Sequence, residues 1–99
     1  MIKQTDFYEV FGYINQWADR VFPNRTDGSI MLKMFEEFGE FVGSPNGQEA
    51  ADVFILLADL CMRNDIDLLK EVHRKMVVNM NREWQINERT GIMKHVGDE

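Results

Sequence analysis

Two pairs of carboxylates are the residues in this sequence best suited to chemistry. Glu37 and Glu40 are three residues apart, and so are Glu49 and Asp52. On a helix, residues three apart share one face, with Cβ atoms roughly 5–6 Å from each other. If both segments are helical and lie side by side, the four carboxylates form one cluster. Such a cluster suits a hard divalent cation, and the sequence predicts Mg²⁺, with Mn²⁺ as a substitute.

The second pair carries more information than the first. The chain contains 17 Asp and Glu residues, so one ExxE pattern is commonly just a solvated helix face. Asp52, however, precedes the most apolar segment, where burying an unpaired carboxylate would cost several kcal/mol. We expect it to have a partner, either a metal ion or a salt bridge to Lys75 or Arg82. Asp59, seven residues later, is expected to be a buried acid that pairs with a cation or caps a neighbouring helix, rather than a metal ligand.

Other kinds of site find little support. The glycines lack the Gly-Lys-Ser/Thr ending of a phosphate-binding loop. His73 and His95 lack zinc-ligand spacing to each other and to Cys61. The single Cys61 cannot form an internal disulfide. A net charge of -6 argues against a nucleic-acid polymer as partner.

The length of 99 residues predicts a single domain, residues 1–99, with a modest core. No apolar run approaches the roughly 18 residues of a membrane span. The polar start, residues 1–6, does not resemble a signal peptide. We therefore expect a cytoplasmic chain with no membrane partner.

Apolar spacing predicts an all-α fold of four main helices that bring the carboxylates together. The first follows Asp6 and ends before Pro23. The second begins with Ser29 as its N-cap and continues to about Val42. The others are expected at about 48–62 and 68–84, with a partly flexible tail at 91–99. Because the loop at 43–47 is short, helices two and three should be antiparallel neighbours.

The third helix suggests an oligomer. Residues 53–61 are apolar at every position except Asp59, which predicts a helix buried nearly all round. Three short helices in one chain would cover it poorly. The sequence therefore predicts an oligomer that shares this helix through an apolar interface.

In this order, the motifs resemble those of the MazG-like nucleoside triphosphate pyrophosphohydrolases. The resemblance covers about residues 17–96. It is carried by a Lys before a Glu-Glu-x-Gly-Glu core, by the ExxE and ExxD pairs, and by a downstream K-x-x-x-N-x-x-R-x-W motif. One departure is that only eight residues separate Glu40 from Glu49, fewer than is usual in the family, so Glu49 is expected in the first turn of its helix.

The resemblance implies a four-helix bundle, assembled as a homodimer or homotetramer. It also implies that the protein converts a nucleoside triphosphate to the monophosphate and pyrophosphate with Mg²⁺, by water attack on the α-phosphate. It implies these roles: metal ligands Glu37, Glu40, Glu49 and Asp52; second-sphere group or catalytic base Glu36, beside catalytic Glu37; substrate contacts Lys33, Lys75, Asn79 and Arg82. An exposed basic face is the alternative for Lys75 and Arg82. Two other functions stay open: an inactive helical interaction module, which the short loop motivates, and a pyrophosphatase specific for dUTP or dCTP.

Overall fold

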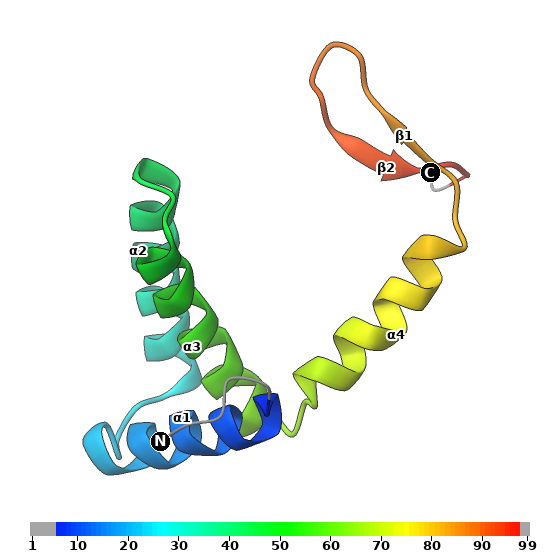
Figure 1. The fold of residues 1–99 in the computed structure, drawn as a ribbon. Helices are drawn as coiled ribbons and strands as arrows, with labels where there is room; N and C mark the ends of the chain where they lie inside the picture. The colour runs from blue at the N-terminus through cyan, green and yellow to red at the C-terminus, as the bar shows by residue number, and fades with distance from the viewer. Residues whose placement is uncertain (1–5, 98–99) are drawn as a thin grey trace. The chain divides into compact units, whose positions relative to one another are not determined.

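The computed structural model describes residues 6–97 as four helices followed by a two-stranded antiparallel sheet (Figure 1). The elements are α1 (Phe7–Val21), α2 (Asp27–Gly43), α3 (Gly47–Arg63), α4 (Leu68–Met80), β1 (Trp84–Ile86) and β2 (Met93–His95). The mostly helical fold with four helices confirms the predicted fold class. None of the described helices is long and apolar enough to cross a membrane.

The chain divides into two compact units, Met1–Leu68 and Leu69–Glu99. The first unit contains α1, α2 and α3, and the second contains α4 and the β-hairpin. Each unit is described by itself below. The single domain inferred from chain length stays a prediction.

Polar side chains cap the first three helices. Asp6 and Asn46 accept hydrogen bonds from the backbone N–H groups of Glu9 and Glu49, at the starts of α1 and α3. For α2 the predicted cap is wrong. Thr26 is the N-cap, and Ser29 completes a reciprocal capping box with it, with distances of 3.1 and 2.9 Å. Because a capping box satisfies two backbone N–H groups, α2 begins at Asp27, two residues before Ser29.

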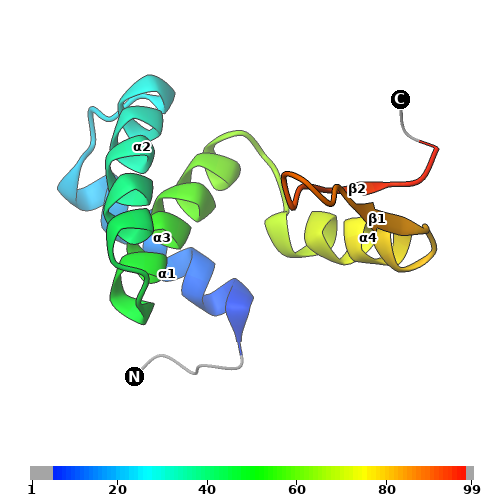
Figure 2. The same cartoon turned by 90° about the horizontal axis from the view of Figure 1, so that it is seen from above.

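Helices α2 and α3 form an antiparallel hairpin, as predicted, and both views show them side by side (Figures 1 and 2). Polar contacts fasten the open end of this hairpin. The Asp27 carboxylate accepts hydrogen bonds from Arg63 Nε at 2.8 Å and Asn64 Nδ2 at 3.0 Å. These contacts join the start of α2 to the end of α3, so the two helices cannot easily slide past each other.

The core of the first unit is small, and α1 and α2 each pack against α3. Its buried apolar residues are Phe11, Ile14, Ala18, Ile30, Ala58 and Cys61. As expected for a single chain, α3 is only partly covered, and its further burial by a second copy stays a prediction. Its described buried residues are Ala58, Asp59 and Cys61, and Phe54 is 38% exposed. The reason is geometric, because within this unit only two helices are available to cover α3.

A buried ion pair joins the α1–α2 loop to α3. Arg25 donates to the two carboxylate oxygens of Asp59 through Nε at 2.7 Å and Nη2 at 2.8 Å. The Arg25 side chain is 7% exposed and that of Asp59 is 5% exposed. Arg25 also donates to Asp19 at 2.9 Å and to the Phe22 carbonyl oxygen at 3.2 Å. The expectation that Asp59 is a buried acid paired with a cation is confirmed.

The second unit corrects the predicted fourth helix. α4 ends at Met80, and Trp84 lies in β1 instead of on the helix. Asn81 turns the chain by donating from its side chain to the Val77 carbonyl oxygen at 2.7 Å. The Trp84 indole donates to the Asn79 carbonyl oxygen at 2.7 Å, which satisfies a group at the helix end.

The hairpin pairs Trp84 with His95 and Ile86 with Met93. Asn87 organises its loop, because the Asn87 carboxamide oxygen accepts hydrogen bonds from the backbone N–H groups of Arg89 at 3.0 Å and Thr90 at 2.9 Å. Gly91 follows with a φ of 74°, a left-handed conformation that glycine adopts at little cost. Of the tail predicted to be partly flexible, residues 93–95 therefore form a strand, and residues 98–99 lie outside the described residues.

Candidate metal and nucleotide site

Three of the four predicted carboxylates meet between α2 and α3. Glu37, Glu49 and Asp52 each place an oxygen within 4.8 Å of the other two. Glu49 lies in the first turn of α3, as expected from the short loop, and Asp52 follows one turn later on the same face. Glu37 reaches them from α2. The shortness of the loop therefore does not prevent Glu49 from joining the cluster.

The cluster has more negative charge than its surroundings compensate. Lys33 Nζ lies 3.3 Å from a carboxylate oxygen of Glu37 and 3.3 Å from one of Glu36. The second oxygens of Glu37 and Glu49 are shielded from water and have no hydrogen-bond partner among the described residues. Carboxylate oxygens left in this state cost free energy unless a cation binds them. An all-oxygen donor set with such oxygens fits a hard divalent ion.

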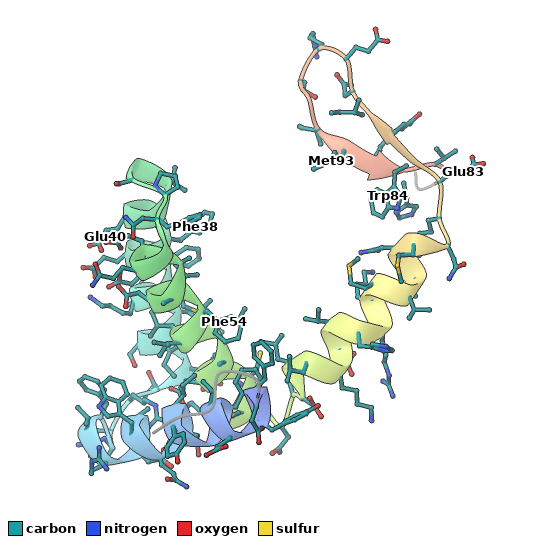
Figure 3. All side chains as sticks on the ribbon, in the orientation of Figure 1. Phe38, Glu40, Phe54, Glu83, Trp84 and Met93 are labelled. Atoms are coloured by element: carbon teal, nitrogen blue, oxygen red, sulfur yellow. The ribbon has the colours of Figure 1, made fainter. Side chains whose placement is uncertain are left out.

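Glu40 lies beside this cluster and is exposed. Hydrogen bonding with the Glu37 carboxyl, followed by charge repulsion from Glu37, raises the pKa of Glu40 above its ordinary value; burial, Glu49 and Glu36 add smaller contributions. Figure 3 shows Glu40 among other side-chain oxygens on one side of the α2–α3 hairpin, and Phe38 and Phe54 on the other. Asp52 is also exposed, so the burial argument made for it from the sequence is wrong. Its distance from Glu37 and Glu49 is what places it in the cluster.

An open cleft of about 1160 Å³ begins at these carboxylates and extends over α1. Its lining includes Lys33, Glu37 and Asp52 near the cluster, and Arg25 and Asp59 elsewhere. Between them the wall is largely apolar, with Ile14, Trp17, Ile30, Ile55 and Leu56 among its residues.

Trp17 is 45% exposed, borders this cleft and makes an edge-to-face contact with Phe22. Sequence reasoning missed the cleft because it is built from three helices and a loop. The signal that could have indicated the cleft was the aromatic side chain of Trp17.

The remaining predicted site residues have different surroundings. Glu36 is exposed and pairs with Lys33, outside the cluster of three. In the second unit, Lys75 and Asn79 are one turn apart on α4, and Arg82 lies just beyond the helix with Nη1 3.2 Å from His95 Nδ1. The Asn79 side-chain oxygen is shielded and has no hydrogen-bond partner among residues 6–97. Substrate contact by Lys75, Asn79 and Arg82 stays a prediction.

Comparison with known proteins identifies the family. A dATP/dGTP diphosphohydrolase of Cyanophage S-2L is 31% identical over 91 residues, which span 89% of this chain and 86% of that protein. The chain belongs to the MazG-like pyrophosphohydrolases. A solved structure of the Cyanophage S-2L MazG-like pyrophosphohydrolase, bound to dGDP and three catalytic Mn²⁺ ions per active site, superposes with a TM-score of 0.80. That comparison has 28% identity and covers 97% of this chain and 98% of the other.

A second relative, a dATP/dGTP diphosphohydrolase of Salmonella phage PMBT28, is 41% identical over 87 residues. These residues span 86% of the present chain but only 30% of that relative's length. No family model matches the chain. The resemblance noted from the sequence motifs is thus confirmed by the Cyanophage S-2L relative and by the solved MazG-like structure, which belong to a family of hydrolases that act on nucleotide phosphoric anhydrides.

Proposed function

We propose that this chain hydrolyses purine deoxynucleoside triphosphates to the monophosphate and pyrophosphate, with Mg²⁺ or Mn²⁺ as cofactor. The observation that carries the proposal is the cluster of Glu37, Glu49 and Asp52 at one end of an apolar cleft, with two shielded oxygens that have no partner in the described part of the chain. The names of the two diphosphohydrolase relatives favour dATP and dGTP over the dUTP or dCTP alternative.

Glu37, Glu49 and Asp52, with Glu40 beside them, would hold the metal. When bound, a divalent ion supplies charge neutralisation to the phosphate oxygens and to the leaving pyrophosphate. Lys33 lies at the same end of the cleft and would contribute a further positive charge to the phosphates. The apolar middle of the cleft, with the exposed ring of Trp17, would hold the base and sugar and exclude water from them.

Glu36 is the proposed proton acceptor for the attacking water. It is exposed, lies one residue before Glu37 and is held by Lys33 at 3.3 Å. In the overall reaction one water is consumed, its oxygen joins the α-phosphorus, and the bond to the pyrophosphate oxygen breaks. Glu36→Gln should then lower kcat while leaving Mn²⁺ affinity close to that of the unaltered protein.

The direct test is pyrophosphate release from dATP and dGTP in the presence of Mg²⁺ or Mn²⁺. Glu37→Gln and Asp52→Asn should each lower kcat/KM at least a hundredfold, above the 10–100-fold cost typical of groups that only support metal ligands. Glu71→Gln, on the exposed face of α4 beside Arg74, is the matched control and should retain full activity. If the unaltered protein binds neither metal nor nucleotide calorimetrically, the inactive interaction module is the better description.

We also propose a homodimer or homotetramer. The outer side of α2 carries an apolar stripe at helical spacing: Met31, Phe35, Phe38 and Val42, which are 46–75% exposed. Exposed apolar stripes of this kind mark interaction surfaces. Light scattering should give a mass above that of one chain, and Phe35→Glu should lower it. A monomeric unaltered protein at micromolar concentration would refute this proposal.

A further inference from the structure

The cleft has a second polar region, which the proposed function does not use. Asn24 and Arg25, from the loop between α1 and α2, line it together with Asp59 of α3. Asp59 follows Asp52 by seven residues on one helix, a rise of about 10 Å. The polar loop thus lies across the apolar middle from the carboxylate cluster, where the end of a bound molecule farthest from its phosphates would be.

The loop that carries Asn24 is held firmly. The Arg25 N–H donates to the Phe22 carbonyl oxygen at 3.2 Å, which closes a turn with Pro23 and Asn24 at its centre. The Arg25 guanidinium is fixed by its bonds to Asp59, Asp19 and the Phe22 carbonyl oxygen. Asn24 itself is exposed, and its side-chain amide makes no hydrogen bond within residues 6–97. A rigid backbone therefore presents an amide that is available to a ligand.

We propose that Asn24 binds the base by hydrogen-bonding the substituent at position 6 of a purine. This inference rests on the proposed function, because it takes the carboxylate end of the cleft as the phosphate end. Adenine carries an amino donor at that position, and guanine carries a carbonyl acceptor. A carboxamide has both an oxygen acceptor and an NH₂ donor, and a half-turn of the side chain exchanges them. One residue can thus accept both purines.

The competing explanation is that Asn24 serves only the turn. Asn is common in turns, and Asp suits the same position equally well. Asn24→Asp therefore preserves the turn but leaves only acceptors. A carboxylate favours the adenine amino group and repels the guanine carbonyl oxygen. The two explanations consequently differ in what this one substitution does.

The experiment compares kcat/KM for dATP and dGTP in the unaltered protein, in Asn24→Asp and in Asn24→Ala. Asn24→Asp should raise the dATP/dGTP ratio about tenfold, the value of one charge-assisted hydrogen bond gained or lost. Asn24→Ala should raise KM for both substrates and leave their ratio near that of the unaltered protein. Gln16→Asp, an exposed amide-to-acid change off the cleft lining, is the control and should leave the ratio unchanged.

An unchanged ratio in a folded Asn24→Asp protein overturns the assignment. A shift toward dGTP also overturns it, because that result places the carboxylate against the ring N–H and 2-amino donors of guanine instead. In addition, the dissociation constants of non-hydrolysable dATP and dGTP analogues are measured calorimetrically in the presence of Mn²⁺. Binding without turnover would contradict the proposed function, while the ratio of dissociation constants still decides the role of Asn24.

Discussion

Asp59 and Glu37 border the same cleft, and their side chains are 5% and 12% exposed, but only Asp59 is fully paired. Both Asp59 oxygens accept from Arg25, whereas one Glu37 oxygen has no partner among the described residues. Burial of an acid alone therefore does not mark a site in this protein. A shielded acid whose two oxygens both accept hydrogen bonds maintains the structure, whereas a shielded acid with one oxygen left without a partner can bind a further cation.

The largest expected effect comes from breaking the ion pair between Asp59 and Arg25. Asp59→Asn should lower the free energy of unfolding by about 3–5 kcal/mol, because it leaves the Arg25 charge buried and partly unpaired. Urea denaturation followed by circular dichroism measures this. Asp52→Asn, an identical chemical change at an exposed position on the same helix, is the control and should cost far less. Equal losses would show that Arg25 tolerates the missing charge.

At Glu37, which has an oxygen without a partner among the described residues, the expected effect is stabilisation by a metal ion. Mn²⁺ at one hundred times its dissociation constant should stabilise the protein by about 2.7 kcal/mol, since it binds the folded state and not the unfolded one. Thermal unfolding with and without Mn²⁺ measures the shift. Glu37→Gln should abolish most of it, and Glu71→Gln should keep it. A full shift in Glu37→Gln would mean that the metal binds elsewhere.

A smaller effect separates two helix caps. Asn46→Ala and Thr26→Ala each remove an N-cap and should each cost about 1 kcal/mol of stability. Asn46 accepts from the backbone N–H of Glu49 at 3.0 Å, so its loss should also loosen Glu49 and weaken Mn²⁺ binding. The Thr26 cap lies at the far end of the hairpin and should not affect the metal. Calorimetric titration with Mn²⁺ distinguishes the two variants. Equal Mn²⁺ affinities would show that Glu49 is not part of the metal site.

The smallest effect concerns pH. Glu37 raises the pKa of Glu40, so protonation of Glu40 is more favourable in the folded protein than in the unfolded chain. The metal-free protein should therefore gain stability from this group as pH falls through the raised pKa, and lose it as pH rises. Melting temperatures of the unaltered protein and Glu40→Gln across the acid range test this, since the variant should lack the contribution. Mn²⁺ should oppose the trend because it requires the ionised form.

Local patterns made much of this structure predictable. Apolar spacing and turn residues located the first three helices, and three-residue spacing identified the carboxylates that meet between α2 and α3. The hairpin was missed because Trp84 continued the helical spacing of α4, although two short β-prone runs flanked a loop ending in Gly91. The partner of Asp59 was not identified, because 34 residues separate it from Arg25. The cleft could not be predicted either, because it depends on how α1 packs across α3, which no local sequence pattern specifies.

The lone thiol of the protein has a practical consequence. Cys61 is buried where α1 packs on α3, and burial raises its pKa above the ordinary value. A neutral, shielded thiol reacts slowly with disulfide reagents, so labelling requires that the surrounding helices open first. The rate at which Cys61 is labelled in the native protein therefore reports how often these helices open. Comparing this rate with and without nucleotide would reveal whether a bound substrate tightens the packing of α1, a motion that neither activity nor global unfolding measures.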